Sequence, residues 1–282
     1  MPLALVLSSH VASSLVGSRP VAHALAMRKI DSLIVPTTLL GRHPGWGPPG
    51  GGGVPRELFV GMLDGLEANG LFALTDAVLT GYFATLAQVE AAVDAIARVR
   101  AARPDVWIVV DPIMGDDEEG LYVKPDVADG VMEKLVPLAD LLAPNLWELG
   151  HLTQGRFGAA PTQPHEIVAT ARRLGRPMLV SSVRDGDRIG AVYVEAESAW
   201  GAFADAQPSA PNGTGDLLVG AFMAARIDGH AAPDALKHAV AVTADIVRKA
   251  VRWNAPELPI VAAQESFSAP FAEVRLVEIA DA

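Results

Sequence analysis

The sequence contains no cysteine and has a deficit of basic residues, and each shortage excludes a kind of chemistry. Without cysteine the chain forms no disulfide, no thiolate metal site and no cysteine nucleophile. Lys and Arg number 22 against 33 Asp and Glu, which gives a net charge of −11, and the basic residues are scattered. A nucleic-acid or membrane-surface binder would carry a basic patch. We therefore expect no nucleic-acid or membrane partner and a cytoplasmic protein.

Long apolar runs are also missing, and none comes near the roughly 20 residues that a membrane span needs. Residues 1–7 are apolar but lack a basic start and end at polar Ser8, so they predict a buried strand rather than a signal peptide. Half of the 282 residues are apolar and 20% are charged, which is typical of a globular protein with a sizeable core. Because no linker of biased composition divides the chain, we expect one domain, 1–282.

Short apolar runs alternate with segments of helical periodicity, which indicates a parallel sheet covered on both faces. The predicted strands are 3–7, 33–37, 77–79, 106–110, 141–143 and 178–180. The predicted helices are 56–69, 86–102, 127–135, 165–174, 217–227 and 233–251. A hairpin is expected at 189–194 and 199–204, and an edge strand at 274–279. The predicted fold class is α/β, a three-layer αβα sandwich with a mostly parallel central sheet.

One segment has low complexity, since residues 44–55 read PGWGPPGGGGVP. So many prolines and glycines predict a flexible loop without regular structure. Such a loop is either a plain surface connection or a mobile flap over a pocket. In the second case the glycines would supply hinge freedom and Trp46 an apolar cover.

The strongest local signal is the run PNGTGD at 211–216, which stands directly before the predicted helix 217–227. A glycine-rich turn that opens a helix directs backbone N–H groups and the positive end of the dipole at one point, which favours an anion. A carboxylate beside a bound anion does not help affinity, but it is placed to accept the proton of an attacking hydroxyl. Asp216 is therefore a candidate catalytic base, and the alternative is that it only caps the helix.

Polar residues also follow other predicted strands, at the edge where α/β sheets bind ligands. Asp111 follows the strand 106–110, where a carboxylate can organise metal and phosphate or merely cap a turn. Beyond the next strand, Asn145 can cap a helix, and Glu148 can complete a capping box or hold Mg²⁺ through water. Ser9 follows the first strand and can bond a polar ring or satisfy buried backbone.

Taken together, these segments resemble the pyridoxal kinases of the ribokinase superfamily, particularly the bacterial pyridoxal/pyridoxamine/pyridoxine kinase type. The resemblance covers nearly the whole chain and rests on five motifs in order: Ser9-His10-Val11, Thr80-Gly81-Tyr82, DPIMGD at 111–116, APNLWEL at 143–149 and GTGD at 213–216. It implies a ribokinase-like homodimer that uses ATP and Mg²⁺. The implied reaction phosphorylates the 5′-hydroxymethyl group of pyridoxal, or of pyridoxine and pyridoxamine, in vitamin B6 salvage.

The resemblance also implies a role for each motif. Asp216 would take the proton of the substrate's hydroxymethyl group. The amides that would stabilise charge on the transferring γ-phosphoryl group belong to Gly213, Thr214 and Gly215. The vitamer would contact Ser9, Thr37, Tyr82 and Asp216. ATP would contact Asp111, Ala143, Glu148 and Ser181, and Mg²⁺ would be held by Asp111 and Glu148, directly or through water.

The chain departs from the family pattern at three places. Ser181 and Ser182 stand where the family often has a lysine that reaches nucleotide phosphate, so neutralisation would depend more on metal, on Arg184 or on the helix dipole. Loop 44–55 has proline and glycine in place of the polar residues usual for the family's flap. Residues 36–39 lack the usual polar residue after the threonine pair. These changes leave the vitamer preference open.

Two other functions stay open at this level. A kinase for hydroxymethylpyrimidine, or with weaker support for a sugar, would share the fold and the base, although the Ser9 and Tyr82 motifs favour B6 vitamers. A non-catalytic vitamer-binding protein would fit the missing lysine and altered loop, whereas the intact GTGD argues for catalysis. The seven histidines show no metal-ligand spacing, so no histidine metal site is expected.

Overall fold

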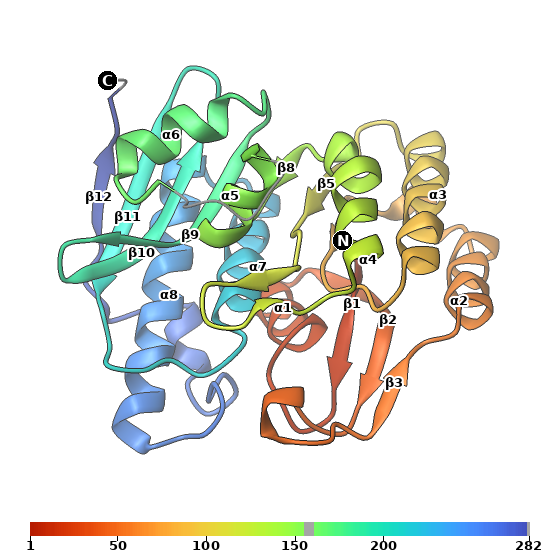
Figure 1. The fold of residues 1–282 in the computed structure, drawn as a ribbon, viewed down its shortest axis with the longest axis horizontal. Helices are drawn as coiled ribbons and strands as arrows, with labels where there is room; N and C mark the ends of the chain where they lie inside the picture. Colours follow the sequence, from red (N-terminus) through yellow and green to blue (C-terminus); the bar gives the residue numbers. More distant parts are fainter. Residues whose placement is uncertain (155–160, 281–282) are drawn as a thin grey trace.

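A ten-stranded sheet organises the computed structural model, which describes residues 1–154 and 161–280. The strand order is β12-β11-β10-β9-β8-β5-β4-β1-β2-β3 (Figure 1). The bounds are β1 (Leu3–Val11), β2 (Asp31–Leu40), β3 (Gly51–Gly53), β4 (Ala77–Thr80), β5 (Trp107–Val110), β8 (Leu141–Leu142), β9 (Met178–Asp185), β10 (Arg188–Val194), β11 (Ala199–Asp205) and β12 (Arg275–Glu278). Strands β2, β1, β4, β5, β8 and β9 run parallel, whereas β3, β10, β11 and β12 pair antiparallel with their neighbours. Two short strands form a separate hairpin, β6 (Gly115–Asp116) and β7 (Gly120–Leu121).

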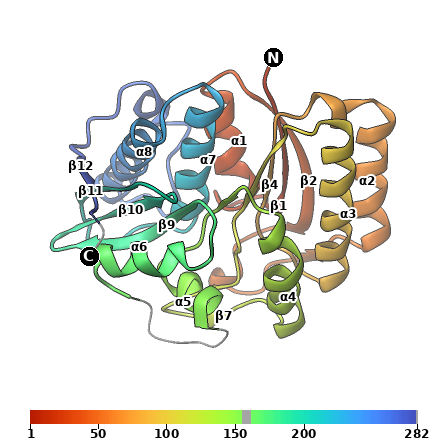
Figure 2. The ribbon, with the colours of Figure 1, turned by 90° about the horizontal axis from the view of Figure 1, so that it is seen from above.

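Helices cover both faces of the sheet (Figure 2). One face carries α2 (Arg56–Ala68), α3 (Leu86–Ala102), α4 (Pro125–Gly130), α5 (Leu146–Gln154) and α6 (Pro164–Arg172). The other carries α1 (Ser18–Ala26), α7 (Thr214–Ile227) and α8 (Ala232–Trp253). Short helical turns are η1 (Pro44–Trp46), η2 (Leu71–Leu74), η3 (Val131–Leu135), η4 (Val136–Leu138) and η5 (Gln264–Phe267). No helix within the described ranges is long and apolar enough to cross a bilayer.

Strand β1 shows why the central strands are apolar without a break. Its side chains alternate between the two faces, so that Leu5 and Leu7 join the core under α2 and α3, while Ala4 and Val6 join the core under α7. All four are fully buried. Burying one aliphatic side chain of the size of Val or Leu contributes roughly 1.5–3 kcal/mol. A strand with a core on each face therefore has no polar side.

The predicted αβα sandwich is confirmed, and most predicted elements are found close to their expected bounds. The expected hairpin is β10 and β11, and the edge strand is β12. The predicted helix 127–135 is instead divided into α4 and the π-helical turn η3. Helix α1 and the β6–β7 hairpin are absent from the sequence prediction.

The prediction that residues 44–55 lack regular structure is wrong. Residues 44–46 form the 3₁₀ turn η1, and β3 pairs antiparallel with β2 over the last three residues of β2. The pairing uses backbone hydrogen bonds alone, so a glycine strand shows no side-chain alternation in the sequence. Gly51 has φ +93° and a Cβ at this position would lie 2.0 Å from the Leu39 carbonyl oxygen, so a side chain is excluded here.

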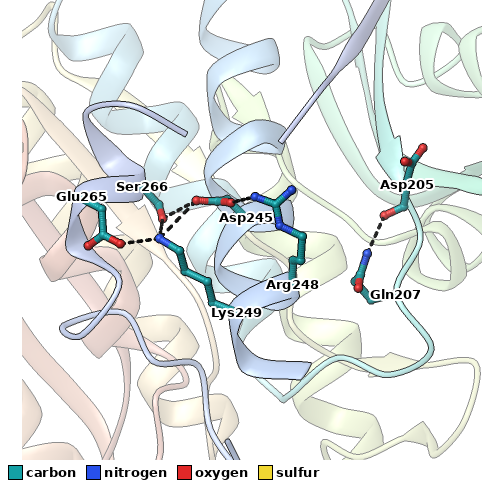
Figure 3. A network of polar contacts seen from close by, with 7 residues as sticks. All are labelled: Asp205, Gln207, Asp245, Arg248, Lys249, Glu265 and Ser266. Carbon is teal, nitrogen blue, oxygen red and sulfur yellow. Dashed lines mark hydrogen bonds and ion pairs between the residues drawn. The ribbon is translucent and has the colours of Figure 1, made fainter. Parts of the chain in front are cut away.

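The segment after α8 is fastened to that helix by a polar network (Figure 3). Asp245 on α8 is fully buried and accepts a hydrogen bond of 2.6 Å from the hydroxyl of Ser266. Lys249 lies one turn further on, where its Nζ is 3.4 Å from Asp245 and 2.5 Å from Glu265. Arg248 also pairs with Asp245. The buried carboxylate is therefore compensated on every side, as a buried charge requires.

Candidate active site

The carboxyl ends of the parallel strands meet at one edge of the sheet, and α7 begins at the same edge. Side chains on the α7 face include Val109, Leu141 and Leu179. Because side chains alternate along a strand, the residue two positions further faces the same way. These further residues are Asp111, Ala143 and Ser181. Three of the candidate nucleotide contacts therefore lie on the face of the sheet that carries α7.

The turn before α7 packs directly against the loop that follows β1. Gly213 precedes the first helical residue with φ +88°, and a Cβ there would lie 2.0 Å from the carbonyl oxygen of Leu15. Only glycine fits this close approach. Across the same contact, the Gly17 amide donates a hydrogen bond of 2.9 Å to Oδ2 of Asp216. Thr214, Gly215 and Asp216 form the first turn, so their amides have no partner within the helix.

Three carboxylates share this region, and burial raises the pKa of each. Burial raises the pKa of Asp216 to about 7, even though the Gly17 amide and its own amide oppose the shift. The pKa of Glu148 rises to about 8 for the same reason. Asp111 has a pKa well above its ordinary value because of burial and the nearby charges of Glu148 and Asp216. The causes that raise these pKa values are burial and neighbouring carboxylates, so the cluster favours a bound cation.

Glu148 and Asn145 form a reciprocal capping box at the start of α5. The Glu148 amide donates to Oδ1 of Asn145 at 2.8 Å, and the Asn145 amide donates to Oε2 of Glu148 at 2.9 Å. The amide of Met114 donates to the other carboxylate oxygen at 2.9 Å. That oxygen also accepts a longer bond of 3.5 Å from the amide of Gly115, so it is Oε2 that keeps a lone pair for water or metal.

The described part of the chain contains no complete protein cage for a metal ion. Among the described residues, no group of three His, Cys, Asp or Glu side chains is gathered closely enough to hold one. Asp111 and Glu148 are hard oxygen ligands of the kind that Mg²⁺ accepts. Mg²⁺ commonly completes its shell with water and substrate phosphates, so two carboxylates fit such an ion.

The candidate vitamer contacts lie at the ends of β1, β2 and β4. Ser9 is buried and Tyr82 is half-buried. Thr37 is fully buried, and its hydroxyl donates 2.6 Å to the carbonyl of Tyr82, while the Tyr82 amide donates 3.3 Å to the hydroxyl of Ser8. In this conformation Thr37 therefore holds the Tyr82 segment and offers no surface to a ligand. The predicted contact of Thr37 with the ring stays a prediction.

On the nucleotide side, Ser181 lies at the end of the parallel part of β9. Its amide donates 3.0 Å to the carbonyl of Pro144, which joins it to the segment that leads into α5. Ser182 is exposed and has φ +62°. The register of β9 and β10 shifts at this point. Ala143 is buried, and Arg184 is exposed two residues beyond Ser182.

The glycine-rich segment reaches the turn before α7. Nδ2 of Asn212 lies 3.4 Å from Nδ1 of His43, the residue that precedes η1. The segment is also bonded to the residue that follows β2, since the Gly41 amide donates to the carbonyls of Pro49 and Gly50. The proline- and glycine-rich residues are therefore neighbours of the candidate catalytic turn.

Sequence reasoning missed two residues that support Asp216. Gly17 supplies the amide that Asp216 accepts. Glu257, after α8, accepts the Ser14 hydroxyl at 2.5 Å and the Leu15 amide at 2.9 Å, so it holds the loop that carries Gly17. The partners of Glu257 lie 242 and 243 residues away in the chain. No local pattern could have connected them.

Comparisons with known proteins show which chains this one is similar to. The family model described as phosphomethylpyrimidine kinase matches residues 74–261. Pyridoxal kinase PdxY of Corynebacterium diphtheriae is 30% identical over 281 residues, which covers 98% of this chain and 99% of that protein. The pyridoxine/pyridoxal/pyridoxamine kinase of Bordetella avium is 37% identical over 218 residues, covering 74% and 72% of the two chains.

A solved structure shares the fold over almost the whole length. It is pyridoxal kinase from Leishmania donovani in complex with ADP and pyridoxamine, and the superposition gives a TM-score of 0.90. The match covers 99% of this chain and 100% of that chain, at 21% sequence identity. The similarity at this level of identity concerns the fold.

Proposed function

Because the chain belongs to the pyridoxal kinase family, we propose that it transfers the γ-phosphoryl group of ATP to the 5′-hydroxymethyl oxygen of pyridoxal. The products are pyridoxal 5′-phosphate and ADP, which is the kinase reaction of vitamin B6 salvage. Pyridoxine and pyridoxamine carry the same hydroxymethyl group and are expected as further substrates. The observation that carries this proposal is Asp216 in the first turn of α7, where the amides have no backbone partner within the helix.

Asp216 is proposed as the base. One carboxylate oxygen is fixed by the Gly17 amide, which leaves the other to accept a proton from the substrate hydroxyl. The hydroxyl oxygen bonds to the γ-phosphorus, the bond to the β,γ-bridging oxygen breaks, and ADP leaves with that electron pair. In a loose transition state the proton moves late, so the base acts mainly by orienting the hydroxyl. A pKa of about 7 suits this task near neutral pH.

The proposed anion hole consists of backbone amides at the start of α7, those of Gly213, Thr214 and Gly215. Amides of the first helical turn point out of the helix, where the helix dipole is positive. Charge that develops on the equatorial oxygens of the γ-phosphoryl group would be stabilised there without any side chain having to move. This arrangement requires no lysine at Ser181 or Ser182.

Mg²⁺ is the proposed metal, held by Asp111 and Glu148 directly or through water. Bound with ATP, Mg²⁺ would neutralise phosphate charge. The two carboxylates would position it between the ends of β5 and β8, with Glu148 fixed by the amides of Met114 and Asn145. Ala143 and Ser181 line the same face and are the proposed further contacts of ATP.

The vitamer is proposed to lie against Ser9, Tyr82 and Asp216, with Thr37 supporting Tyr82 from behind. Residues 44–55 would form a flap over this side, for which their contact through His43 with the turn before α7 is the support. We further propose that residues 1–282 act as one kinase domain and that two copies form a homodimer in the cytoplasm.

A second candidate is a hydroxymethylpyrimidine kinase, which the match to the phosphomethylpyrimidine kinase family model favours. The two functions differ in substrate and share the base and the fold. A substrate panel with Mg·ATP and pyridoxal, pyridoxine, pyridoxamine and hydroxymethylpyrimidine separates them. We expect the highest kcat/KM with a B6 vitamer. Preferential turnover of hydroxymethylpyrimidine would mean that this compound, and not a B6 vitamer, is the substrate. Tight binding of pyridoxal without turnover would indicate a vitamer-binding protein.

A further inference from the structure

Gln88 is a fully buried polar side chain that the proposed reaction does not use. It lies in the first turn of α3, and its Nε2 donates to two backbone carbonyls, those of Thr37 and Val54, at 2.7 Å each. Its Oε1 accepts a hydrogen bond of 3.0 Å from the amide of Ala84. Both donors and the acceptor of the amide therefore have partners on the backbone.

The three partners belong to three different segments around the proposed vitamer side of the site. Thr37 is near the end of β2, Val54 follows β3 at the end of the glycine-rich segment, and Ala84 lies between β4 and α3. Two further bonds tighten the junction, because the Val54 amide donates 2.8 Å to the Thr37 carbonyl and the Thr37 hydroxyl donates 2.6 Å to the Tyr82 carbonyl. Gln88 is the one side chain in this set that bonds all three segments.

The chemistry of an amide is needed at this position. Glutamate would lack the two hydrogens that the carbonyls of Thr37 and Val54 accept, and leucine would satisfy none of the three groups. The Thr37 carbonyl would keep the Val54 amide, but the Val54 carbonyl would lose the donor that Gln88 supplies. A buried carbonyl without a donor is costly, so we expect the segments to move apart to reach water. A side chain with both donors and an acceptor holds the segments at a fixed spacing.

We propose that Gln88 is a positioning residue that sets the shape of the vitamer side of the site. It does so by holding Thr37, Val54 and the segment from Tyr82 to Ala84 in one arrangement. The inference rests on the proposed function, because it takes Tyr82 to line the vitamer side. Asp111 and Glu148, the proposed contacts of ATP and Mg²⁺, make no hydrogen bond with Gln88 among the described residues, so we expect the nucleotide side to be little affected by Gln88.

The test compares Gln88→Leu and Gln88→Glu with the unaltered protein, by measuring KM for pyridoxal and for ATP between pH 5.5 and 8.5. Small displacements of positioning groups cost up to about 10² in rate constants. We expect Gln88→Leu to raise KM for pyridoxal about tenfold or more at every pH and to leave KM for ATP within about twofold.

Gln88→Glu adds a second measurement, the pH dependence of KM for pyridoxal, which a loss of packing alone would not change. A protonated glutamate can donate to one carbonyl and still accept from the Ala84 amide, whereas the ionised form has no donor. The ratio of its KM for pyridoxal to that of the unaltered protein at the same pH is therefore expected to fall as the pH is lowered. A ratio that does not change with pH, or a rise in KM for ATP as large as that for pyridoxal, would overturn the positioning role.

Val99→Ala is the matched control. Val99 is fully buried in the last turns of the same helix α3, so its truncation weakens the packing of α3 without removing a bond to the three segments. We expect Val99→Ala to lower Tm and leave KM for pyridoxal unchanged. If it raises KM as much as Gln88→Leu does, the effect of Gln88 is general destabilisation and the proposal is wrong.

Hydrogen exchange separates this inference from the proposed function, because it needs no substrate. The amides of Val54 and Ala84 donate within the junction. In the ligand-free protein they are expected to exchange faster in Gln88→Leu than in Val99→Ala. Equal rates in the two variants would contradict the role of Gln88 whatever the substrate. The unaltered protein could phosphorylate no vitamer while the exchange rates of the two variants still differ. In that case the proposed function is wrong, and the role of Gln88 in holding the three segments is retained.

Discussion

Asp216 sits where burial opposes the charge that its proposed role requires. The pKa of this carboxyl is about 7, against an ordinary value of 3.8. Between these two pH values the folded state binds the proton and the unfolded state does not, so this group makes folding less favourable as the pH rises from about 4 to about 7. The cost is complete above pH 7 and absent below pH 4. A buried carboxylate that lowers stability when it is ionised is typical of catalytic groups.

Asp216→Asn is therefore expected to raise Tm at pH 8 and to leave it unchanged near pH 4. The amide oxygen of asparagine can still accept from Gly17, so the geometry is kept. Asp245→Asn is the control of opposite sign, because hydrogen bonds from Ser266 and the charges of Lys249 and Arg248 lower the pKa of Asp245 despite its burial. That variant is expected to lower Tm at pH 8. Scanning calorimetry at the two pH values measures both, and a pH-independent gain for Asp216→Asn contradicts the account.

At the scale of elements, the sequence predicted what local patterns encode. The apolar runs of the parallel strands and the GTGD turn before α7 were identified because a strand with two cores and a glycine-opened helix have distinct signatures. Strand β3 is not predicted by the sequence, because its three glycines pair through the backbone alone. The loop after β1 is held by Glu257, and Val54 is held by a hydrogen bond from Gln88. Both contacts join distant parts of the chain. Such contacts leave no periodicity to find.

Two glycines in helices are predicted to respond with opposite signs. A Cβ at Gly220 of α7 would lie 2.8 Å from the Cα of Val21 in α1, so Gly220→Ala is expected to lower the free energy of unfolding by about 1–3 kcal/mol. Gly61 of α2 is exposed with open space around it, so Gly61→Ala is expected to raise it by about 0.5–1 kcal/mol. Urea unfolding measures both. Equal changes in the two variants would show that helix propensity alone governs these sites.

Glu257 is predicted to influence the reaction through the loop after β1. Glu257→Ala removes the acceptor of Ser14 and Leu15, which loosens the loop that carries the Gly17 amide to Asp216. We expect kcat to fall by about tenfold with KM for ATP nearly unchanged. Steady-state kinetics measure this, with Glu273→Ala, an exposed residue of the same C-terminal segment, as the control. An unchanged kcat for Glu257→Ala would contradict the prediction that Glu257 acts on Asp216 through the loop that carries Gly17.

The whole molecule is acidic, with a net charge of −11, and the candidate site adds clustered carboxylates with raised pKa values. An anionic nucleotide approaches such a surface against its field. We therefore expect the molecule to depend on a divalent cation and on the α7 amides to hold phosphate.

Mg²⁺ and ADP together are accordingly expected to raise Tm, whereas ADP with EDTA is expected to have little effect. A ligand that binds only the folded state at about 100 times its Kd adds about 2.7 kcal/mol of stability. Glu148→Gln should remove most of the Mg²⁺-dependent part. Differential scanning fluorimetry with and without EDTA tests this, and a rise in Tm that is the same in EDTA would mean that the carboxylates hold no metal with the nucleotide.

The central claim is that Asp216 is the base of a pyridoxal kinase, and one measurement tests it most directly. It is the initial rate of pyridoxal 5′-phosphate formation from pyridoxal and Mg·ATP, compared between the unaltered protein and Asp216→Asn, with the circular dichroism spectrum and ADP binding checked in both. We predict that the variant keeps its fold and its nucleotide and loses about 10² or more in kcat. A folded variant that retains the rate within a few-fold would contradict the account.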